Sequence, residues 1–402
     1  MLGERGRFEA GFFYKEINMT LDLTGEQRMI QTMARQFSRN VVAANAAERD
    51  MTREFPVESF KKMGELGLMG MMIPFKYDGS GSDAVSYVLA LVEIAYSCAS
   101  TAVVMSVQNS IINESVHNFG SEEQKQKYLK PLAAGKAIGA FALTEPEAGS
   151  DPVKQTSTAV RDGNYYVLNG IKRFITTGKN SNIVIVTAKT DESKGHKGIS
   201  VFIVEKGTPG LTVGPLENKL GLRASDTTDL IFEDCRVPAE NLLGNEGDGF
   251  LISMIGLDSG RIGIAAQSVG VAQAAFDLAV KYATGRIYFG KPLSQLQPLR
   301  WMIADMATEI EASRQLMLAA AAKKDRGETY TTQASMAKLF ASEMANRVTG
   351  KALEIHEGYG YMKEYLVERF YRDSRVFTIY EGTSEIQRLV ISRDILKKMR
   401  LP

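Results

Sequence analysis

The sequence predicts an α+β fold in which a middle β region separates two helical regions. Apolar residues recur at helical spacing near both ends of the chain, whereas the middle consists of short β-rich runs broken by glycine, proline and charged turns. Because no helix-length pattern lies between these runs, a compact antiparallel barrel or sandwich is favoured over a doubly wound βαβ domain. We expect a terminal arm at 1–20, a helical domain at 21–139, a β domain at 140–250 and a helical bundle at 251–402.

The first helical region opens with a clear start signal. Thr24-Gly25-Glu26-Gln27 matches a capping box, in which two side chains satisfy free N–H groups at the helix start. Apolar residues then recur at helical spacing from Met29 to Val42. Further helices are predicted at Pro56–Leu66, Ser86–Ser97 and Thr101–Phe119, and another begins at Ser121-Glu122-Glu123-Gln124, with its acids at the positive helix end.

The middle region predicts short strands. Tyr165–Leu168 and Ile171–Thr177 flank Asn169-Gly170, a dipeptide typical of a two-residue hairpin turn. The other predicted strands are Ile183–Ala188, Ile199–Val204, Leu211–Val213 and Leu230–Phe232.

The last region predicts a four-helix bundle. Three apolar stripes recur at helical spacing, and we interpret their many methionines as core rather than as a binding groove. A terminal helix with its N-cap at Thr383 or Ser384 completes the bundle. The stripes are Ile262 to Ala279, Leu299 to Met317, and Ala337, Phe340, Met344, Val348 and Ile355; the terminal helix contributes Ile386, Leu389, Val390 and Ile395.

Composition excludes several classes of protein. The 48 basic and 47 acidic residues give a formal charge of +1 with no basic stripe, so nucleic acid is not an expected partner. Two cysteines and three scattered histidines predict neither a disulfide scaffold nor a metal centre. No apolar run approaches a membrane-spanning length, and residues 1–20 fit neither a signal peptide nor a transit peptide. We expect a cytoplasmic protein, or a mitochondrial matrix protein if the source is eukaryotic.

One stretch near the C-terminus, Thr378–Arg388, places a carboxylate between an aromatic residue and a glycine. Glu381 precedes the start of the terminal helix, where irregular backbone can direct a side chain into a cleft. Tyr380 offers it an apolar neighbour, and desolvation raises the pKa of a carboxyl group towards the range useful for a general base. An ordinary acidic residue near a positive helix end is the alternative at this point.

Two other stretches combine polar groups in a way that suits ligands. Phe141–Asp151 carries hydroxyls, acids and a glycine at a domain junction, where large ligands often bind, although a structural loop is equally compatible. Arg286–Gly290 places a guanidinium beside two aromatic residues, which suits phosphate pairing or stacking, or simply a helix-end cation. Gly358-Tyr359-Gly360 is only part of a dinucleotide-binding pattern.

Together these stretches resemble the acyl-CoA dehydrogenase family, most closely its short-chain, butyryl-CoA type. The resemblance covers roughly residues 21–400 in collinear order and includes Gly120–Lys125, Gly221–Ser225 and Tyr380–Arg388. It implies the family's fold, an N-terminal helical domain, a middle β barrel or sandwich and a C-terminal four-helix bundle. It also implies a homotetramer with one FAD per subunit.

The resemblance implies a reaction as well. Glu381 is the base that takes the pro-R α-proton, and its backbone N–H, with a flavin ribityl hydroxyl, holds the thioester carbonyl. The β-hydrogen leaves as hydride to flavin N5, a trans-2-enoyl-CoA forms, and electron-transfer flavoprotein is the usual acceptor. Closing the site around the thioester would exclude water.

Other roles carry over by position. The resemblance implies FAD contacts by Phe141, Leu143, Thr144, Ser150, Phe174, Thr176, Arg286, Phe289, Gln297, Glu354, Gly358, Thr383 and Glu385, with Arg286, Phe289 and Gln297 reaching across a subunit interface. It implies substrate contacts by Ser150, Arg261, Tyr380 and Gly382. Phe174 replaces the tryptophan of a Trp-x-Thr pair, which keeps the packing and loses an indole donor.

Two positions discriminate within the family, and one stretch departs from its usual pattern. Isovaleryl-type and long-chain members carry their base one residue before the equivalent of Arg261, and here that residue is Gly260. Ala102 occupies the place of the arginine that glutaryl-CoA dehydrogenases present to a distal carboxylate, so a dicarboxylic substrate is not expected. The usual Gln-x-x-Gly-Gly-x-Gly-Tyr is here Glu354–Tyr361, in which Glu354 and Glu357 either face solvent or pair with Arg286 or His356.

The sequence therefore predicts FAD-dependent α,β-dehydrogenation of a short-chain, small branched or alicyclic acyl-CoA. The expected partners are the acyl-CoA substrate, electron-transfer flavoprotein and further copies of the chain. An acyl-CoA oxidase and a non-catalytic relative that binds flavin or acyl-CoA are the alternatives.

Overall fold

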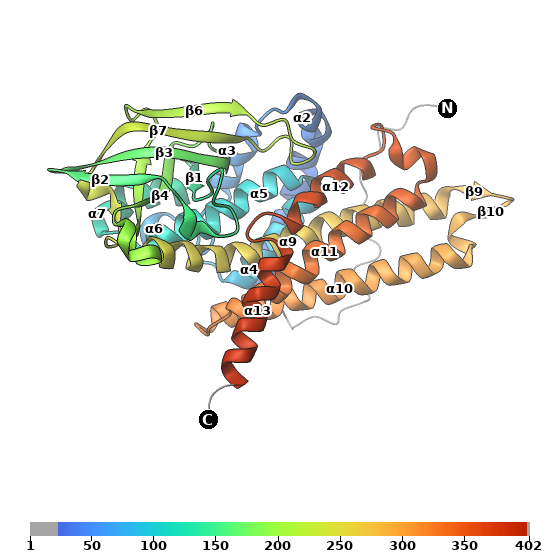
Figure 1. Ribbon diagram of the computed structural model, residues 1–402. Helices are drawn as coiled ribbons and strands as arrows, with labels where there is room; N and C mark the ends of the chain where they lie inside the picture. Colours follow the sequence, from blue (N-terminus) through green and yellow to red (C-terminus); the bar gives the residue numbers. More distant parts are fainter. Residues whose placement is uncertain (1–22, 400–402) are drawn as a thin grey trace.

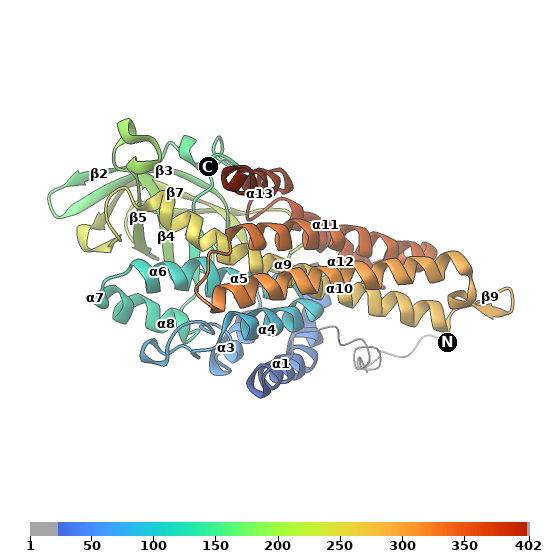
Figure 2. The ribbon, with the colours of Figure 1, turned by 90° about the horizontal axis from the view of Figure 1, so that it is seen from below.

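Residues 23–399 are described by the computed structural model of the protein, in which a β domain sits at one end of a long assembly of helices (Figure 1). The order is helical, then β, then helical, as the sequence predicts. The predicted arm at 1–20 lies outside the described residues. Seen from below, the helices α9 (Gly249–Gly285), α10 (Gln297–Asp325) and α11 (Thr331–Ile355) run side by side towards the hairpin that carries β9 (Ile287–Tyr288) (Figure 2).

The N-terminal helices follow the predicted starts closely. Gln27 N donates to Thr24 Oγ1 at 3.1 Å and Thr24 N donates to Gln27 Oε1 at 2.9 Å, so the capping box is present. The predicted helix at Thr101–Phe119 is broken by a π-helical segment at 108–112. The helices are α1 Gly25–Phe37, α2 Ala46–Thr52, α3 Val57–Glu65, α4 Ala84–Ser97, α5 Ala99–Val107, α6 Asn113–Phe119, α7 Glu122–Gln124 and α8 Lys130–Ala133.

The middle domain is one mixed sheet around its own apolar core. Its order is β6-β7-β3-β2-β4-β5-β8, with β1 paired to β4. Most pairs are antiparallel as expected, but β1 and β2 each pair with β4 in parallel. The strands are β1 Gly139–Ala142, β2 Thr158–Asp162, β3 Tyr165–Thr176, β4 Ile183–Lys189, β5 Ile199–Glu205, β6 Leu211–Leu216, β7 Thr227–Pro238 and β8 Leu242–Leu243.

The predicted hairpin turn at Asn169-Gly170 is wrong. These residues lie inside β3, and the strand continues through them between two neighbours, β2 and β7, with a register shift against β7 that marks a β-bulge. A Cβ at Gly170 would lie 2.2 Å from Ser157 Oγ, so the glycine permits a close approach rather than a chain reversal. The actual turn precedes β3, where Gly163 has a φ of 58°.

The C-terminal region is built on α9, which packs against α4, α10 and α11. Every residue of α4 is buried, so this N-terminal helix supplies the fourth packed surface. The segments are α9 Gly249–Gly285, β9 Ile287–Tyr288, β10 Lys291–Pro292, α10 Gln297–Asp325, α11 Thr331–Ile355, α12 Val367–Ser374 and α13 Ser384–Met399.

The terminal helix α13 does not complete the bundle as predicted. Its apolar residues Leu389 and Ile395 remain 46% and 47% exposed, and only Ser384 and Gln387 are buried. The predicted core residue Phe340 on α11 is also 36% exposed. Helical spacing identifies an apolar face, but it does not determine whether another part of the same chain covers that face.

Helix α9 corrects the expectation that no apolar run reaches membrane-spanning length. Among the described residues it is the one helix long and apolar enough to span a bilayer, with a mean hydropathy of 1.3 over its most apolar window. That window is 67% buried inside the fold. Burial on several sides, against α4, α10 and α11, accounts for this composition.

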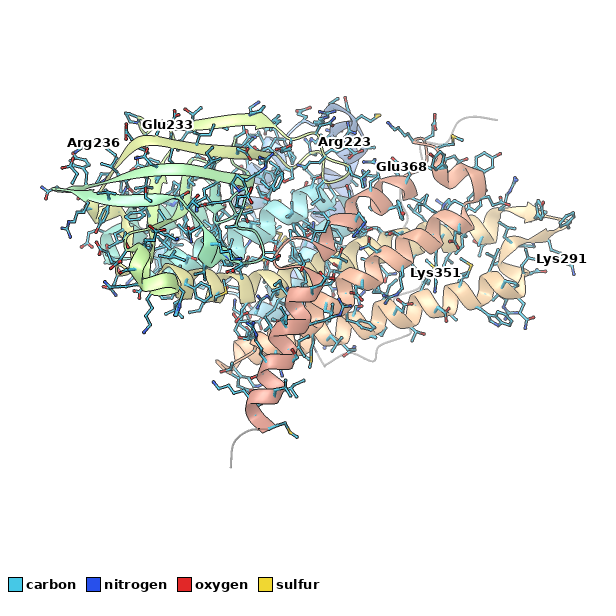
Figure 3. All side chains as sticks on the ribbon, in the orientation of Figure 1. Arg223, Glu233, Arg236, Lys291, Lys351 and Glu368 are labelled. Atoms are coloured by element: carbon cyan, nitrogen blue, oxygen red, sulfur yellow. The ribbon has the colours of Figure 1, made fainter. Side chains whose placement is uncertain are left out.

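A polar cluster ties the β domain to both helical regions. Leu222 N donates to Asp373 Oδ1 at 2.6 Å, and Arg223 Nε donates to Asp50 O at 2.9 Å. Arg372 Nη2 pairs with Asp50 Oδ2 at 2.6 Å. Figure 3 shows Arg223 and Glu368 at this junction. The loop after β6 is therefore fixed to α2 and α12, on the chain segment that leads to Glu381.

Candidate active site

The turn that carries Glu381 has unusual backbone geometry. Glu381 and the following Gly382 have φ values of 53° and 86°, both in the left-handed region. For a residue with a side chain this conformation costs about 1–2 kcal/mol. Gln387 Nε2 donates to the carbonyls of both residues, at 3.0 and 2.9 Å, and Lys338 Nζ donates to Gly382 O at 2.7 Å. Tertiary contacts therefore hold a backbone shape that local preferences disfavour.

The Glu381 carboxylate is desolvated. Although the residue as a whole is partly exposed, Oε2 is buried and has no hydrogen-bond partner among the described residues. Burial raises the pKa of the carboxyl group to about 7, while Arg261 and, to a lesser degree, Lys338 favour the charged form. Such a group can accept a proton near neutral pH.

Gly260 on α9 lies directly against this carboxylate. A Cβ at this position would be 2.6 Å from Glu381 Oε2 and 2.9 Å from its Cδ. Any side chain here would therefore displace the carboxylate. The adjacent Arg261 is buried and pairs with Asp258 at 2.5 Å, and Thr331 Oγ1 donates to the same aspartate at 2.5 Å.

Tyr380 lies beside the turn as the sequence suggested. Its ring stacks on Phe377 with centroids 6.1 Å apart, and its hydroxyl donates to Gln267 Oε1 at 2.5 Å. The ring packs on the apolar core. Burial raises the pKa of the phenol well above its ordinary value, so Tyr380 stays neutral.

The loop after β1 is anchored on the β domain. Arg173 N donates to Thr144 O at 2.7 Å, which brings this loop beside the end of β3. Phe174 has a φ of 58° and is 56% exposed, so the strand presents an aromatic ring to its surroundings. Phe141, Leu143, Thr144 and Thr176 are partly buried, whereas Ser150 is exposed.

Glu145, an acid within this loop, is a structural residue. It pairs with Lys172 at 2.7 Å in the interior of the domain and accepts from Thr156 N at 2.5 Å and Ser157 N at 3.1 Å. Burial alone would raise the pKa of Glu145, but the Lys172 ammonium and these donors hold it at about 2. The pair fixes the base of the loop and leaves Thr144 partly accessible.

The expected dinucleotide residues lie elsewhere. Arg286, Phe289 and Gln297 belong to the hairpin and helix start at the far tip of the bundle, remote from the start of α13 in both views (Figures 1 and 2). Phe289 is 90% exposed. One chain therefore does not bring these residues to Glu381.

Glu354 and Glu357, the two acids that depart from the family's usual pattern, lie in different environments. Glu357 Oε2 lies 3.5 Å from Arg286 Nε and accepts from the Tyr282 hydroxyl at 3.2 Å, so it pairs with the expected phosphate ligand. Its φ of 56° suits the glycine that usually stands there. Glu354 and Gly358 are exposed.

The residues around the turn fit a bound flavin. Glu381 Oε2, Ser384 Oγ and Gln387 Oε1 are buried without partners among the described residues, so three polar atoms within seven positions remain for a ligand. Thr383 is partly exposed and Glu385 is exposed. An exposed aromatic ring at Phe174 and free polar atoms are what an amphipathic ring system requires.

Sequence reasoning missed Lys338, Gln387 and Gln267, which hold the turn and Tyr380. A signal was available for Lys338, because it follows Ala334 and Ala337 on the buried face of α11, where a lysine is unexpected.

The chain is similar to acyl-CoA dehydrogenases along most of its length. The chain matches acyl-CoA dehydrogenase N-terminal, middle and C-terminal domain profiles at residues 24–136, 140–235 and 247–396. Short-chain specific acyl-CoA dehydrogenase of Clostridium acetobutylicum is 49% identical over 379 residues, covering 94% of this chain and 100% of the relative. The mitochondrial short-chain specific enzyme of Rattus norvegicus is 47% identical, covering 96% and 93%. Acryloyl-CoA reductase (NADH) of Anaerotignum propionicum is 48% identical, covering 94% and 97%.

Solved structures agree in fold. Butyryl-CoA dehydrogenase from Megasphaera elsdenii superposes with a TM-score of 0.92 at 44% identity, covering 94% of this chain and 100% of that one. A chain from work on the electron transferring flavoprotein of Acidaminococcus fermentans gives a TM-score of 0.93 at 47% identity, with the same coverage.

Proposed function

Because the chain belongs to the acyl-CoA dehydrogenase family of FAD-dependent oxidoreductases, we propose that it dehydrogenates a short-chain acyl-CoA with Glu381 as the base. The observation that carries this proposal is the buried, unpartnered carboxylate oxygen above Gly260. With a pKa of about 7, Glu381 is ionised in a large fraction of molecules near neutral pH.

Each residue around the turn has a separate task in this proposal. The Glu381 carboxylate accepts the α-proton of the thioester. Its own backbone N–H donates to none of the described residues, so it is free to bond to the thioester oxygen as negative charge develops there. Arg261 and Lys338 favour the ionised base. When bound, FAD supplies the acceptor for the β-hydrogen.

We propose that the acyl chain lies along the face of α9 that carries Gly260 and that neighbouring side chains limit its length. Gly263 lies three residues, about 4.5 Å along the helix axis, beyond Gly260 on α9. A Cβ at Gly263 would meet Ser106 Oγ at 2.2 Å and the Tyr87 hydroxyl at 2.7 Å, and both residues are buried. An acyl chain that runs along this face of the helix therefore meets a polar wall after a short distance.

A substrate panel tests the acyl group. Butyryl-, isobutyryl-, 2-methylbutyryl-, hexanoyl-, glutaryl- and cyclohexanecarbonyl-CoA are compared by flavin bleaching, and we expect butyryl-CoA to react fastest and glutaryl-CoA not to react. Tyr87→Ala should raise the hexanoyl-to-butyryl rate ratio about 10-fold or more, because it opens the wall, whereas Tyr87→Phe should leave the ratio within a few-fold. An unchanged ratio in Tyr87→Ala would show that the chain lies elsewhere.

A cavity of about 820 Å³ between the α10–α11 connection and α13 offers room for the phosphorylated end of CoA. Thr331 lines this cavity, and its hydroxyl donates to Asp258, the ion-pair partner of Arg261. Lys398 pairs with Asp394 at 2.7 Å, but Arg393 has no acidic partner among the described residues. We propose that Arg393 contacts a CoA phosphate.

The remaining partners follow from the same comparison. We propose a homotetramer, because the Arg286 hairpin can complete a flavin site only on another copy. Electron-transfer flavoprotein is the proposed acceptor, since a chain from a study of that protein is structurally similar. Reduction of electron-transfer flavoprotein without matching peroxide formation in air would separate this enzyme from an acyl-CoA oxidase. Because one relative is named acryloyl-CoA reductase, the assay is run in both directions.

The central test is Glu381→Gln. We expect the variant to bind FAD and to lose flavin bleaching by butyryl-CoA, because the amide cannot accept the proton. Glu233→Gln is a matched control on the exposed face of β7 (Figure 3) and should react as the wild type does. Substantial bleaching in Glu381→Gln would reject the assignment, and a yellow wild-type protein that no acyl-CoA reduces would indicate a non-catalytic relative.

A further inference from the structure

Lys338 is a buried cation that the proposed reaction does not use directly. It lies in the first third of α11 and is 0% exposed. Lysine is seldom fully buried without an ion-pair partner, because desolvation disfavours its charge. Among the described residues no carboxylate lies within ion-pair distance of its ammonium group, and its single hydrogen-bond acceptor is Gly382 O at 2.7 Å.

That one bond acts on the backbone of the proposed base. Gly382 directly follows Glu381, and both residues are in the left-handed region. Gln387 Nε2 donates to the same carbonyl and to that of Glu381. Two buried side chains from α11 and α13 thus hold the backbone of the turn, while the Glu381 carboxylate lies against Gly260.

Most of the charged groups near Lys338 form ion pairs with other residues. Those that face it are Glu381 in the turn, Arg261 on α9, Glu385 on α13 and Glu343 on α11. Arg261 is paired with Asp258 at 2.5 Å, Glu343 is paired with Arg388 at 2.6 Å, and Glu385 lies 3.8 Å from that same arginine. Lys338 and Glu381 are the two groups of opposite charge that have no other ion-pair partner in the described part of the chain.

We propose that Lys338 is a positioning residue, whose ammonium group holds the Gly382 carbonyl so that Glu381 stands over Gly260, and whose charge favours the ionised base. This role rests on the proposed function of Glu381. Burial lowers the pKa of Lys338 to about 8, with Glu381 acting in the opposite direction, so the cation is present at neutral pH.

The test isolates proton abstraction from oxidation. Acetyl-CoA has α-hydrogens but no β-carbon, so the FAD-loaded enzyme can exchange its α-hydrogens with D2O without oxidising it. Exchange is followed by NMR from pH 5 to 9. For Lys338→Met we expect at least a 10-fold lower maximal rate and an acidic midpoint about one pH unit higher, because an opposite charge near the base is lost.

Two comparison variants separate charge from position. Gln387→Met removes a neutral donor from the same carbonyls, so it should lower the maximal rate and leave the midpoint unchanged. Lys351→Met removes a lysine from the same helix that pairs with Asp305 at the surface, and it should match the wild type (Figure 3). Methionine fills the site of Lys338 without burying a charge, so Lys338→Met should melt no lower than the wild type. If it does not fold, Lys338→Gln carries the same test of the midpoint.

The outcomes distinguish this proposal from the one it rests on. An exchange profile in Lys338→Met identical to that of Lys351→Met would overturn the role of Lys338. A lower rate with an unchanged midpoint would remove its electrostatic part and refute the proposal as stated. Wild-type exchange in Glu381→Gln would instead reject the base itself, whatever Lys338→Met shows.

Discussion

Gly260→Ala tests the geometry of the site without altering any charged group. The new Cβ would lie 2.6 Å from Glu381 Oε2, and ordinary contact begins at about 3.4 Å, so the carboxylate must move by about 0.8 Å. A misplacement of 1 Å at a reacting group can cost about 100-fold in rate, which corresponds to roughly 3 kcal/mol of barrier. Stability should change little, because the displaced atoms end a side chain and alanine favours the helix by about 1 kcal/mol.

The assay is anaerobic stopped-flow bleaching of the flavin by butyryl-CoA, with FAD content and melting temperature measured alongside. Gly350→Ala on α11 is the control, since its Cβ would meet only one atom at 3.9 Å. We expect full FAD content and a rate about 100-fold lower in Gly260→Ala, against a wild-type rate in the control. A wild-type rate in Gly260→Ala would show that the carboxylate does not work from this position.

Three further predictions concern protonation, loop anchoring and the CoA end. The pKa of Glu381 in the folded protein, about 7, lies above its ordinary 4.5. The protonated form therefore stabilises the fold at low pH, and this contribution is lost as the pH rises through 7. The unfolding free energy of Glu381→Gln should exceed that of the wild type by up to about 3 kcal/mol at pH 8 and match it at pH 4. Equal pH dependence in thermal melts of the two proteins would contradict this. Glu145→Gln leaves Lys172 buried and unpaired, and should cost about 3–5 kcal/mol in denaturant unfolding, with most of the loss recovered by adding Lys172→Met; a loss below 1 kcal/mol would contradict the anchor. Arg393→Gln should raise KM for butyryl-CoA about 10-fold and leave KM for butyryl-pantetheine unchanged, since the latter lacks the phosphates; equal effects on both would place the phosphates elsewhere.

Local rules predicted the helices well where the signal is short-range. The Thr24 capping box forms as expected, because its hydrogen bonds join residues three apart. The same kind of rule failed at Asn169-Gly170, whose composition suits a turn, because pairing with β7 and the approach of Ser157 decide the path of the strand. The prediction that the terminal helix is buried in the bundle was wrong for a similar reason. The sequence shows that this helix has an apolar face, but it does not show whether another part of the chain packs on that face.

Some features of the candidate site also follow from neighbouring residues, whereas others depend on contacts between distant parts of the chain. The sequence alone determined the carboxylate at Glu381, its flanking Tyr380 and Gly382, and the order of helical and β regions, because each is a matter of neighbouring residues and periodicity. Only the tertiary structure decided that Gly260, Lys338 and Gln387 meet this turn, although they come from three helices. The raised pKa of the Glu381 carboxyl group depends on burial, and its left-handed backbone depends on donors from other helices. No single stretch of residues determines either property.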